Sequence, residues 1–191
     1  MSLIAFLREN VRFLSAGGLL SFSSCYGQTF FIAIFAAQIM DGYGLSDGEW
    51  GGVYTLATTV SAVVMFWAGA LADRFRVRAL ACIVMPGLAL VCLAMGANAS
   101  VVGLIVVVFL LRFLGQGMMS QLALVAMARW FVARRGLALS ISALGFAVGQ
   151  AAFPVVVASL FDVISWRTVW FLSAALLMLA FPVILWLLSA E

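Results

Sequence analysis

The chain has 191 residues, of which 66% are hydrophobic and 9% are charged, and its mean hydropathy is +1.24. This composition excludes an ordinary soluble domain and predicts an all-α integral membrane protein. The net charge is +3, all ten basic residues are arginine, and histidine is missing. Without histidine, the usual zinc sites and Ser-His nucleophiles are excluded, so we expect no metal, no cofactor and no enzymatic activity. A basic balance in a membrane chain does not indicate a nucleic-acid partner.

Six apolar segments are long enough to cross the hydrocarbon core as helices, which takes about 20 residues. They are expected near residues 13–40, 49–71, 77–97, 101–128, 136–160 and 168–188, and together they make a single six-helix bundle over residues 1–191. With this topology one face of the membrane carries Arg8, Arg12, Arg74, Arg76, Arg78, Arg129, Arg134 and Arg135, and the other carries only Arg167. Because arginine-rich loops stay in the cytoplasm, both termini are predicted to be cytoplasmic.

The first span carries a cluster of polar residues near its middle, namely Ser21, Ser23, Ser24, Gln28 and Thr29. Such a face is costly against lipid, so it should face protein or a watery cavity. Gln28 is therefore a candidate binding residue. A hydrogen bond between helices, with no ligand, explains it equally well.

The second span opens with Ser46-x-x-Glu49, the pattern of a capping box that starts a helix. Tyr54 follows, together with Thr55, Thr58 and Thr59. This polar stripe could line a pore, with Tyr54 as a binding residue, or it could simply bond to its own backbone.

The second span ends in a dense cluster of charge, Gly-x-Leu-Ala-Asp-Arg-x-x-x-Arg over residues 69–78. The segment resembles the signature between the second and third helices of the major facilitator superfamily, although the family usually has glycine at position 76 and a basic residue at 77. The resemblance implies that Gly69, Asp73, Arg74 and Arg78 form a gating motif that contacts a second bundle. A cytoplasmic loop that merely collects arginines is the alternative interpretation.

The fourth span contains Arg112 near its middle, where a charged side chain costs at least ~2.5 to 3.5 kcal/mol. No Asp or Glu lies inside any of the six spans to pair with it. Its partner is then a carboxylate elsewhere or an anionic substrate, unless carbonyls and water satisfy it as a packing residue. Arg112 with Gly115, Gln116 and Gly117 also resembles the fourth-helix pattern of the superfamily, which implies substrate contact or ion coupling.

The fifth span carries Gly136, Gly145 and Gly149, which resemble the leading glycines of the superfamily's fifth-helix motif, although the proline comes one turn late, at Pro154. Glycines four residues apart allow two helices to cross closely. Gln150 is a further candidate binding residue. Just before this span, residues 130–138 resemble the monocarboxylate and oxalate/formate branch of the superfamily.

The two halves of the chain share a spacing, since Leu-x-Asp-x-x-x-x-Arg occurs at residues 71–78 and again at 160–167. The two copies lie on opposite faces of the membrane, as an inverted three-plus-three repeat predicts. A complete member of the superfamily has two six-helix halves around a midplane site. The resemblance therefore implies that this chain is one half, and that the second bundle is a missing C-terminal half, a separate chain or a second copy.

The function expected from these features is secondary active transport of a small solute by alternating access, with a small organic anion as the cargo. Symport and antiport, and proton coupling, remain open, and a bacterial inner membrane is the expected location. The alternative within transport is the efflux of hydrophobic, drug-like compounds. The alternative of another class is a membrane scaffold or assembly partner that transports nothing.

Overall fold

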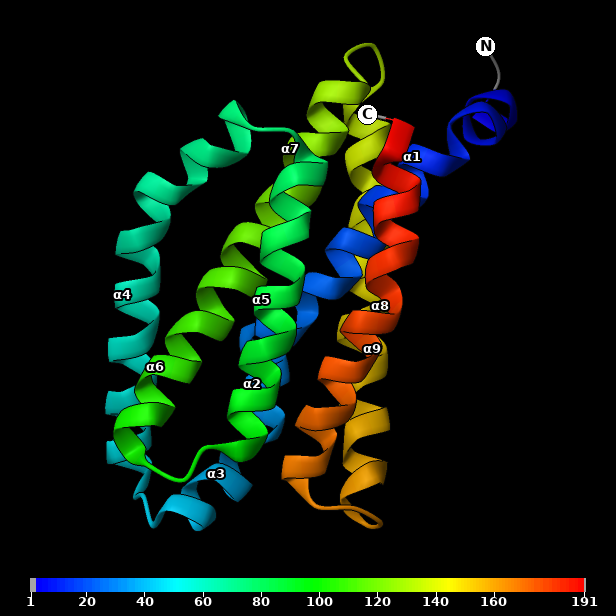
Figure 1. Cartoon of the computed structure of the whole chain (residues 1–191). Coiled ribbons are helices and arrows are strands. Elements are labelled where there is room, and N and C mark those ends of the chain that lie inside the picture. The colour runs from blue at the N-terminus through cyan, green and yellow to red at the C-terminus, as the bar shows by residue number, and fades with distance from the viewer. Residues whose placement is uncertain (1–2, 191) are drawn as a thin grey trace.

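The computed structural model describes residues 3–190, and it is helical throughout that range, with short connections and no strand (Figure 1). The prediction of an all-helical membrane protein is confirmed. Five helical segments are long and apolar enough to cross a membrane: α4 (Asp47–Arg74), α5 (Val77–Ala97), α6 to α7 (Val101–Trp130), α8 (Arg135–Phe161) and α9 (Trp166–Leu187). They correspond to the second to sixth predicted spans.

The first predicted span is broken into pieces. It consists of α1 (Leu3–Ser23), a 3-10 turn (Ser24–Gly27), α2 (Thr29–Ile34) and α3 (Ala36–Tyr43). Gln28 between the turn and α2 is extended, with φ −80° and ψ 153°, so the helix cannot continue through it. The prediction of one continuous helix at residues 13–40 is therefore wrong.

The fourth predicted span is also irregular. Between α6 (Val101–Leu111) and α7 (Ser120–Trp130) the chain forms a π-helical segment, η2 (Arg112–Met119). π-Helical turns inside α-helices are rare and are often found at functional sites. Both irregular segments meet in the middle of the molecule, because the 3-10 turn packs against η2.

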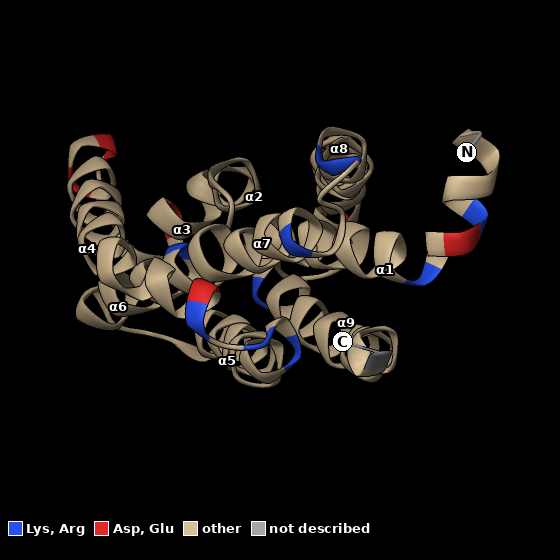
Figure 2. Cartoon of the chain, turned by 90° about the horizontal axis from the view of Figure 1, so that it is seen from above, with Lys and Arg blue, Asp and Glu red and all other residues tan. Residues whose placement is uncertain are grey.

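The helices pack in pairs. α5 packs along α9, α1 along α8, and α4 against α6 and η2. Seen from above, α5 and α9 lie on one side of α1 and α7, whereas α8 and α2 lie on the other (Figure 2). The α4–α5 and α7–α8 turns lie at the same end of the bundle as the end of α9 (Figure 1).

The second span begins as the sequence predicts. Ser46 accepts a hydrogen bond from the backbone N–H of Glu49, and the Glu49 carboxylate accepts one from the N–H of Ser46. The predicted capping box is confirmed. It satisfies two N–H groups that the start of α4 would otherwise leave free.

Three arginines donate to carbonyls at the C-terminal ends of helices, which lack partners within the helix. Arg129 donates to the end of α4, Arg12 donates to the end of α9, and Arg167 donates to the end of α5. The acceptors are the carbonyl oxygens of Phe75 at 3.0 Å, Leu187 at 3.1 Å and Gly96 at 3.1 Å. Each cation therefore lies at the negative end of a helix dipole and joins two elements.

The glycines of α8 differ in how closely they meet α1. A Cβ on Gly145 would overlap the carbonyl oxygen of Gly18 and lie 3.1 Å from its Cα, and one on Gly149 would lie 2.6 Å from the Sγ of Cys25. A Cβ on Gly136 would meet nothing within 4 Å. Gly145 and Gly149 therefore let α1 and α8 pack closely, whereas Gly136 takes no part in this packing.

Replacing Gly145 with alanine should lower the stability of the protein by roughly 1–3 kcal/mol, because the new methyl group meets backbone that cannot rotate away. Gly136→Ala on the same helix is the matched control. It should be neutral or slightly stabilising, since alanine favours helix over glycine. Thermal unfolding in detergent measures both, and equal midpoints for the two variants would contradict the close packing of α1 and α8.

Candidate functional site

Arg112 is the first residue of η2 and is 7% exposed, so its guanidinium lies inside the protein rather than in lipid. It donates to the side-chain oxygen of Thr29 at 2.8 Å, to the carbonyl oxygen of Gly27 at 3.5 Å, and to the amide oxygen of Gln116. Within residues 3–190 no carboxylate lies within ion-pair distance of it. All of its partners are neutral, and its charge is not balanced.

The broken first span supplies two of these partners. Because Gln28 is extended, the carbonyl of Gly27 lies at the end of the 3-10 turn, where it is free to accept from Arg112. Thr29 begins α2, so its side chain points to the same place. The break in the helix is therefore what makes room for a cation at this depth of the bundle.

Two glycines bring the irregular segments together. A Cβ on Gly27 would lie 2.7 Å from the Cα of Gly115 and would overlap the carbonyl oxygen of Leu111. A Cβ on Gly115 would lie 2.7 Å from the backbone nitrogen of Gly27. Only residues without side chains fit at this crossing, and the crossing holds the acceptors next to Arg112.

At this site two buried polar atoms have no hydrogen-bond partner. They are the Nε of Arg112 and the hydroxyl of Tyr54. The guanidinium carbon lies 5.9 Å from the centre of the Tyr54 ring, which adds a cation–π contact. Buried donors of this kind are normally satisfied, so the site can still accept a hydrogen-bond acceptor such as an anion or a water molecule.

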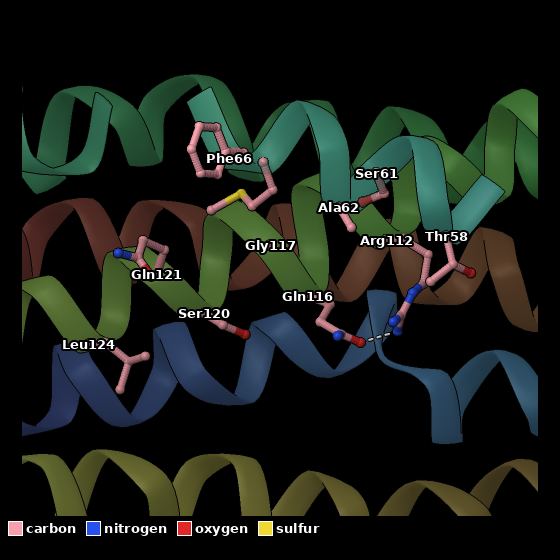
Figure 3. A pocket seen from close by; sticks show the side chains of 11 residues that line it. Thr58, Ser61, Ala62, Phe66, Arg112, Gln116, Gly117, Ser120, Gln121 and Leu124 are labelled. Carbon is pink, nitrogen blue, oxygen red and sulfur yellow. Dashed lines mark hydrogen bonds between the residues drawn. The ribbon is translucent and has the colours of Figure 1, made fainter. Parts of the chain in front are cut away.

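A cavity of about 510 Å³ opens beside Arg112, and we call it the arginine cavity (Figure 3). Polar side chains from α4 and from the η2–α7 segment form part of its lining, beside apolar ones. They are Thr58, Ser61, Gln116, Ser120 and Gln121, with Met65, Phe66 and Leu124 as the larger apolar members.

A second cavity of about 380 Å³, which we call the serine cavity, lies between α1, α7 and α8. Its polar lining consists of Ser21, Ser24, Gln28, Gln116, Ser120 and Ser142. The hydroxyls of Ser21 and Ser142 lie 2.8 Å apart, and Gln28 donates to the hydroxyl of Ser120 at 3.2 Å. The two cavities share three lining residues, Gln116, Ser120 and Leu124.

The structure brings most of the expected binding residues together. Arg112 and Gln116 line the arginine cavity, Gln28 lines the serine cavity, and Tyr54 contacts the guanidinium. Gln150 is exposed on α8 and lines neither cavity.

Sequence analysis did not select the lining residues Ser61, Ser120, Gln121 and Ser142. A signal for one of them was present, because Arg112, Gln116 and Ser120 follow each other at intervals of four residues, as on one face of a helix. No pattern in the sequence indicates Ser142 on α8, since only the packing of α8 against α1 shows where its side chain points.

The charged signature at residues 69–78 lies apart from both cavities, at the end of α4 and the start of α5. Asp73 and Arg74 are exposed, and Gly69 meets only its own helix, through Met65. Arg129 at the end of α7 donates to the carbonyl oxygen of Asp73. This link, which ties the signature to the fourth span, was not expected from the sequence.

These observations define a multi-pass helical membrane protein with a polar interior around an unbalanced cation. The family model of the Major Facilitator Superfamily matches residues 17–191, and the chain belongs to this family. Its members are transporters rather than enzymes, so the chain is a membrane transporter in the general sense. No curated protein matches it in sequence.

Proposed function

We propose that the chain forms one half of a secondary transporter that moves a small organic anion across a membrane by alternating access. The observation that carries the proposal is Arg112, a buried cation with an unpartnered nitrogen, no carboxylate within ion-pair distance in residues 3–190, and a cavity of about 510 Å³ beside it. An anion entering this cavity would balance the charge and accept from the free donor. The similarity of residues 130–138 to the monocarboxylate and oxalate/formate branch supports the same class of cargo.

The lining of the arginine cavity favours this cargo over a drug-like compound. Pockets for hydrophobic compounds are lined mainly by apolar and aromatic side chains. Here five polar side chains accompany the arginine, and Phe66 is the one aromatic residue in the described lining. A scaffold that transports nothing would have no use for a cation held at this depth at such cost.

A second six-helix bundle is the partner that the surface supports. α4 and α8 are among the least buried of the spanning helices, with 17% and 11% of their apolar windows buried. Their exposed large apolar residues are Leu56, Val60, Val63, Phe66, Trp67 and Leu71 on α4, and Leu144, Val148, Val155 and Val156 on α8. α4 also lines the arginine cavity, so a bundle placed against it would close the site from the open side.

The topology proposed with this function has both ends of the chain in the cytoplasm, in a bacterial inner membrane. The end of the bundle that holds the α4–α5 and α7–α8 turns carries most of the arginines (Figures 1 and 2). No acid faces the cavities among the described lining residues. Proton coupling, if present, would therefore use the second bundle or the protonation of the cargo itself.

The proposal is tested by transport with a charged compound and its neutral isostere. The complete gene product, reconstituted in proteoliposomes, should take up labelled lactate in a saturable way, and excess unlabelled carboxylate should compete. Lactamide has nearly the same shape but no charge, so it should not compete. Uptake that lactamide inhibits as well as lactate does would contradict an anion site.

A further inference from the structure

The helix that carries Arg112 has a cavity on each side. Three of its residues, Gln116, Ser120 and Leu124, line both the arginine cavity and the serine cavity. The two cavities are therefore neighbours with this row of side chains between them, and a cargo molecule held at Arg112 would have to pass between these side chains to reach the second space. The chemistry of the serine cavity then decides which kind of tail fits.

The serine cavity offers hydroxyl and amide groups without charge, beside the apolar side chains of Leu124, Leu139, Ala143 and Phe146. Its polar lining is four serines and two glutamines, and no arginine, aspartate or glutamate is among the described residues that line it. A second carboxylate would enter this space without a cation to balance it, which is costly in the interior of a membrane protein. A dicarboxylate therefore fits poorly.

The hydroxyls of the serine cavity can serve a neutral polar tail. Because the oxygens of Ser21 and Ser142 lie 2.8 Å apart, one of the two O–H groups donates to the other oxygen and the second O–H stays free to donate elsewhere. Ser120 accepts from Gln28, so its own O–H is likewise free. An alkyl tail would displace water and leave these hydroxyl groups unpaired, which makes its binding weaker than that of a hydroxylated tail.

Gln116 connects the two spaces. Its amide oxygen accepts from Arg112, so its NH₂ group is left to donate toward a cargo that passes between the cavities. We propose that the cargo is a hydroxylated monocarboxylate, whose carboxylate binds at Arg112 while its hydroxylated tail occupies the serine cavity. This inference rests on the proposed function and narrows its substrate class.

Three probes of equal carbon-chain length test the inference: gluconate, hexanoate and adipate. Binding is measured on the complete gene product in nanodiscs by calorimetry. Gluconate should bind at least about tenfold more tightly than hexanoate, which lacks the hydroxyls, and adipate should bind more weakly than gluconate. Hexanoate or adipate binding as well as gluconate, or no binding of gluconate at millimolar concentration, would overturn the inference.

The double variant Ser21→Ala/Ser142→Ala removes both partners of one hydrogen bond and leaves neither unpaired. It should weaken gluconate binding by about tenfold and leave hexanoate binding unchanged or tighter. Ser140→Ala is the matched control, because this serine is exposed on α8 and bonds only to the carbonyl of its own helix. Equal changes for both probes would count against a hydroxyl-binding space. If the double variant does not fold, the order of the three probes on the unaltered protein decides.

A third variant separates failure of this inference from failure of the proposed function. Arg112→Gln should weaken gluconate and hexanoate alike, because both carry a carboxylate. If it weakens neither, the anion site itself is wrong. If it weakens both while the serine double variant does not discriminate between them, the anion site stands and the hydroxylated tail is rejected.

Discussion

Replacing Arg112 with glutamine should lower the efficiency of organic anion uptake by about tenfold to a hundredfold, which corresponds to the loss of one charged hydrogen-bonding partner. Glutamine can still donate to Thr29 or Gly27, so the local hydrogen bonds are kept in part. What it removes is the positive charge. Because burying that charge is costly, the thermal stability of Arg112→Gln should stay the same or rise.

The control for this variant is Arg8→Gln, which makes the same change of charge at an exposed position on α1. It should leave uptake unchanged. Arg112→Lys adds a graded test, since lysine keeps the charge but lacks the planar guanidinium, in which Nη1 makes the three hydrogen bonds and Nε stays unpartnered. Its uptake should lie between those of the unaltered protein and Arg112→Gln. Full uptake by Arg112→Gln in proteoliposomes would refute the role proposed for the guanidinium.

Replacing Gly27 with alanine should disrupt the site through the backbone. The added Cβ would overlap the carbonyl oxygen of Leu111 and lie 2.7 Å from the Cα of Gly115, and neither atom can move without shifting η2. We expect a loss of stability of roughly 1–3 kcal/mol or more, as for overpacked cores. Uptake should fall as well, because the shift separates Arg112 from its acceptors on the first span.

Gly18→Ala is the matched control for this effect, because it lies on the same span and an added Cβ there would meet nothing within 4 Å. Thermal unfolding in detergent and uptake by proteoliposomes are measured for both variants. If Gly27→Ala unfolds at the same temperature as Gly18→Ala and transports normally, the crossing of the two irregular segments is not as close as described.

The sequence predicted the regular part of this molecule well. The second to sixth spans follow from apolar segments bounded by charge, because only a helix satisfies its own backbone in lipid. Arg112 stood out for a related reason, since a lone cation within an apolar span needs a partner. These features depend on the chain's own composition and need no knowledge of how the helices pack.

The irregular part could not be predicted in the same way. Hydropathy over residues 13–40 is the same for a continuous helix and for one that breaks at Gln28, so the break depends on what packs against it. The π-helical segment and the serine of α8 at the second cavity likewise depend on contacts between distant elements. Gly27 shows most clearly what the sequence alone cannot predict. This position must be a glycine because Gly115, far along the chain, packs against it.

The broken first span also bears on how the protein is made. Arg112 reaches the bilayer during synthesis 85 residues after Gly27, and by then its two acceptors on the first span, Gly27 and Thr29, have already been inserted. The hydrogen-bond acceptors on the first span are therefore in the membrane before Arg112 is inserted. The guanidinium can bind them at once and need not stay exposed to the acyl chains until a later helix is made. A chain whose segments were permuted, so that Arg112 preceded the first span, should insert less efficiently even though its final contacts would be the same.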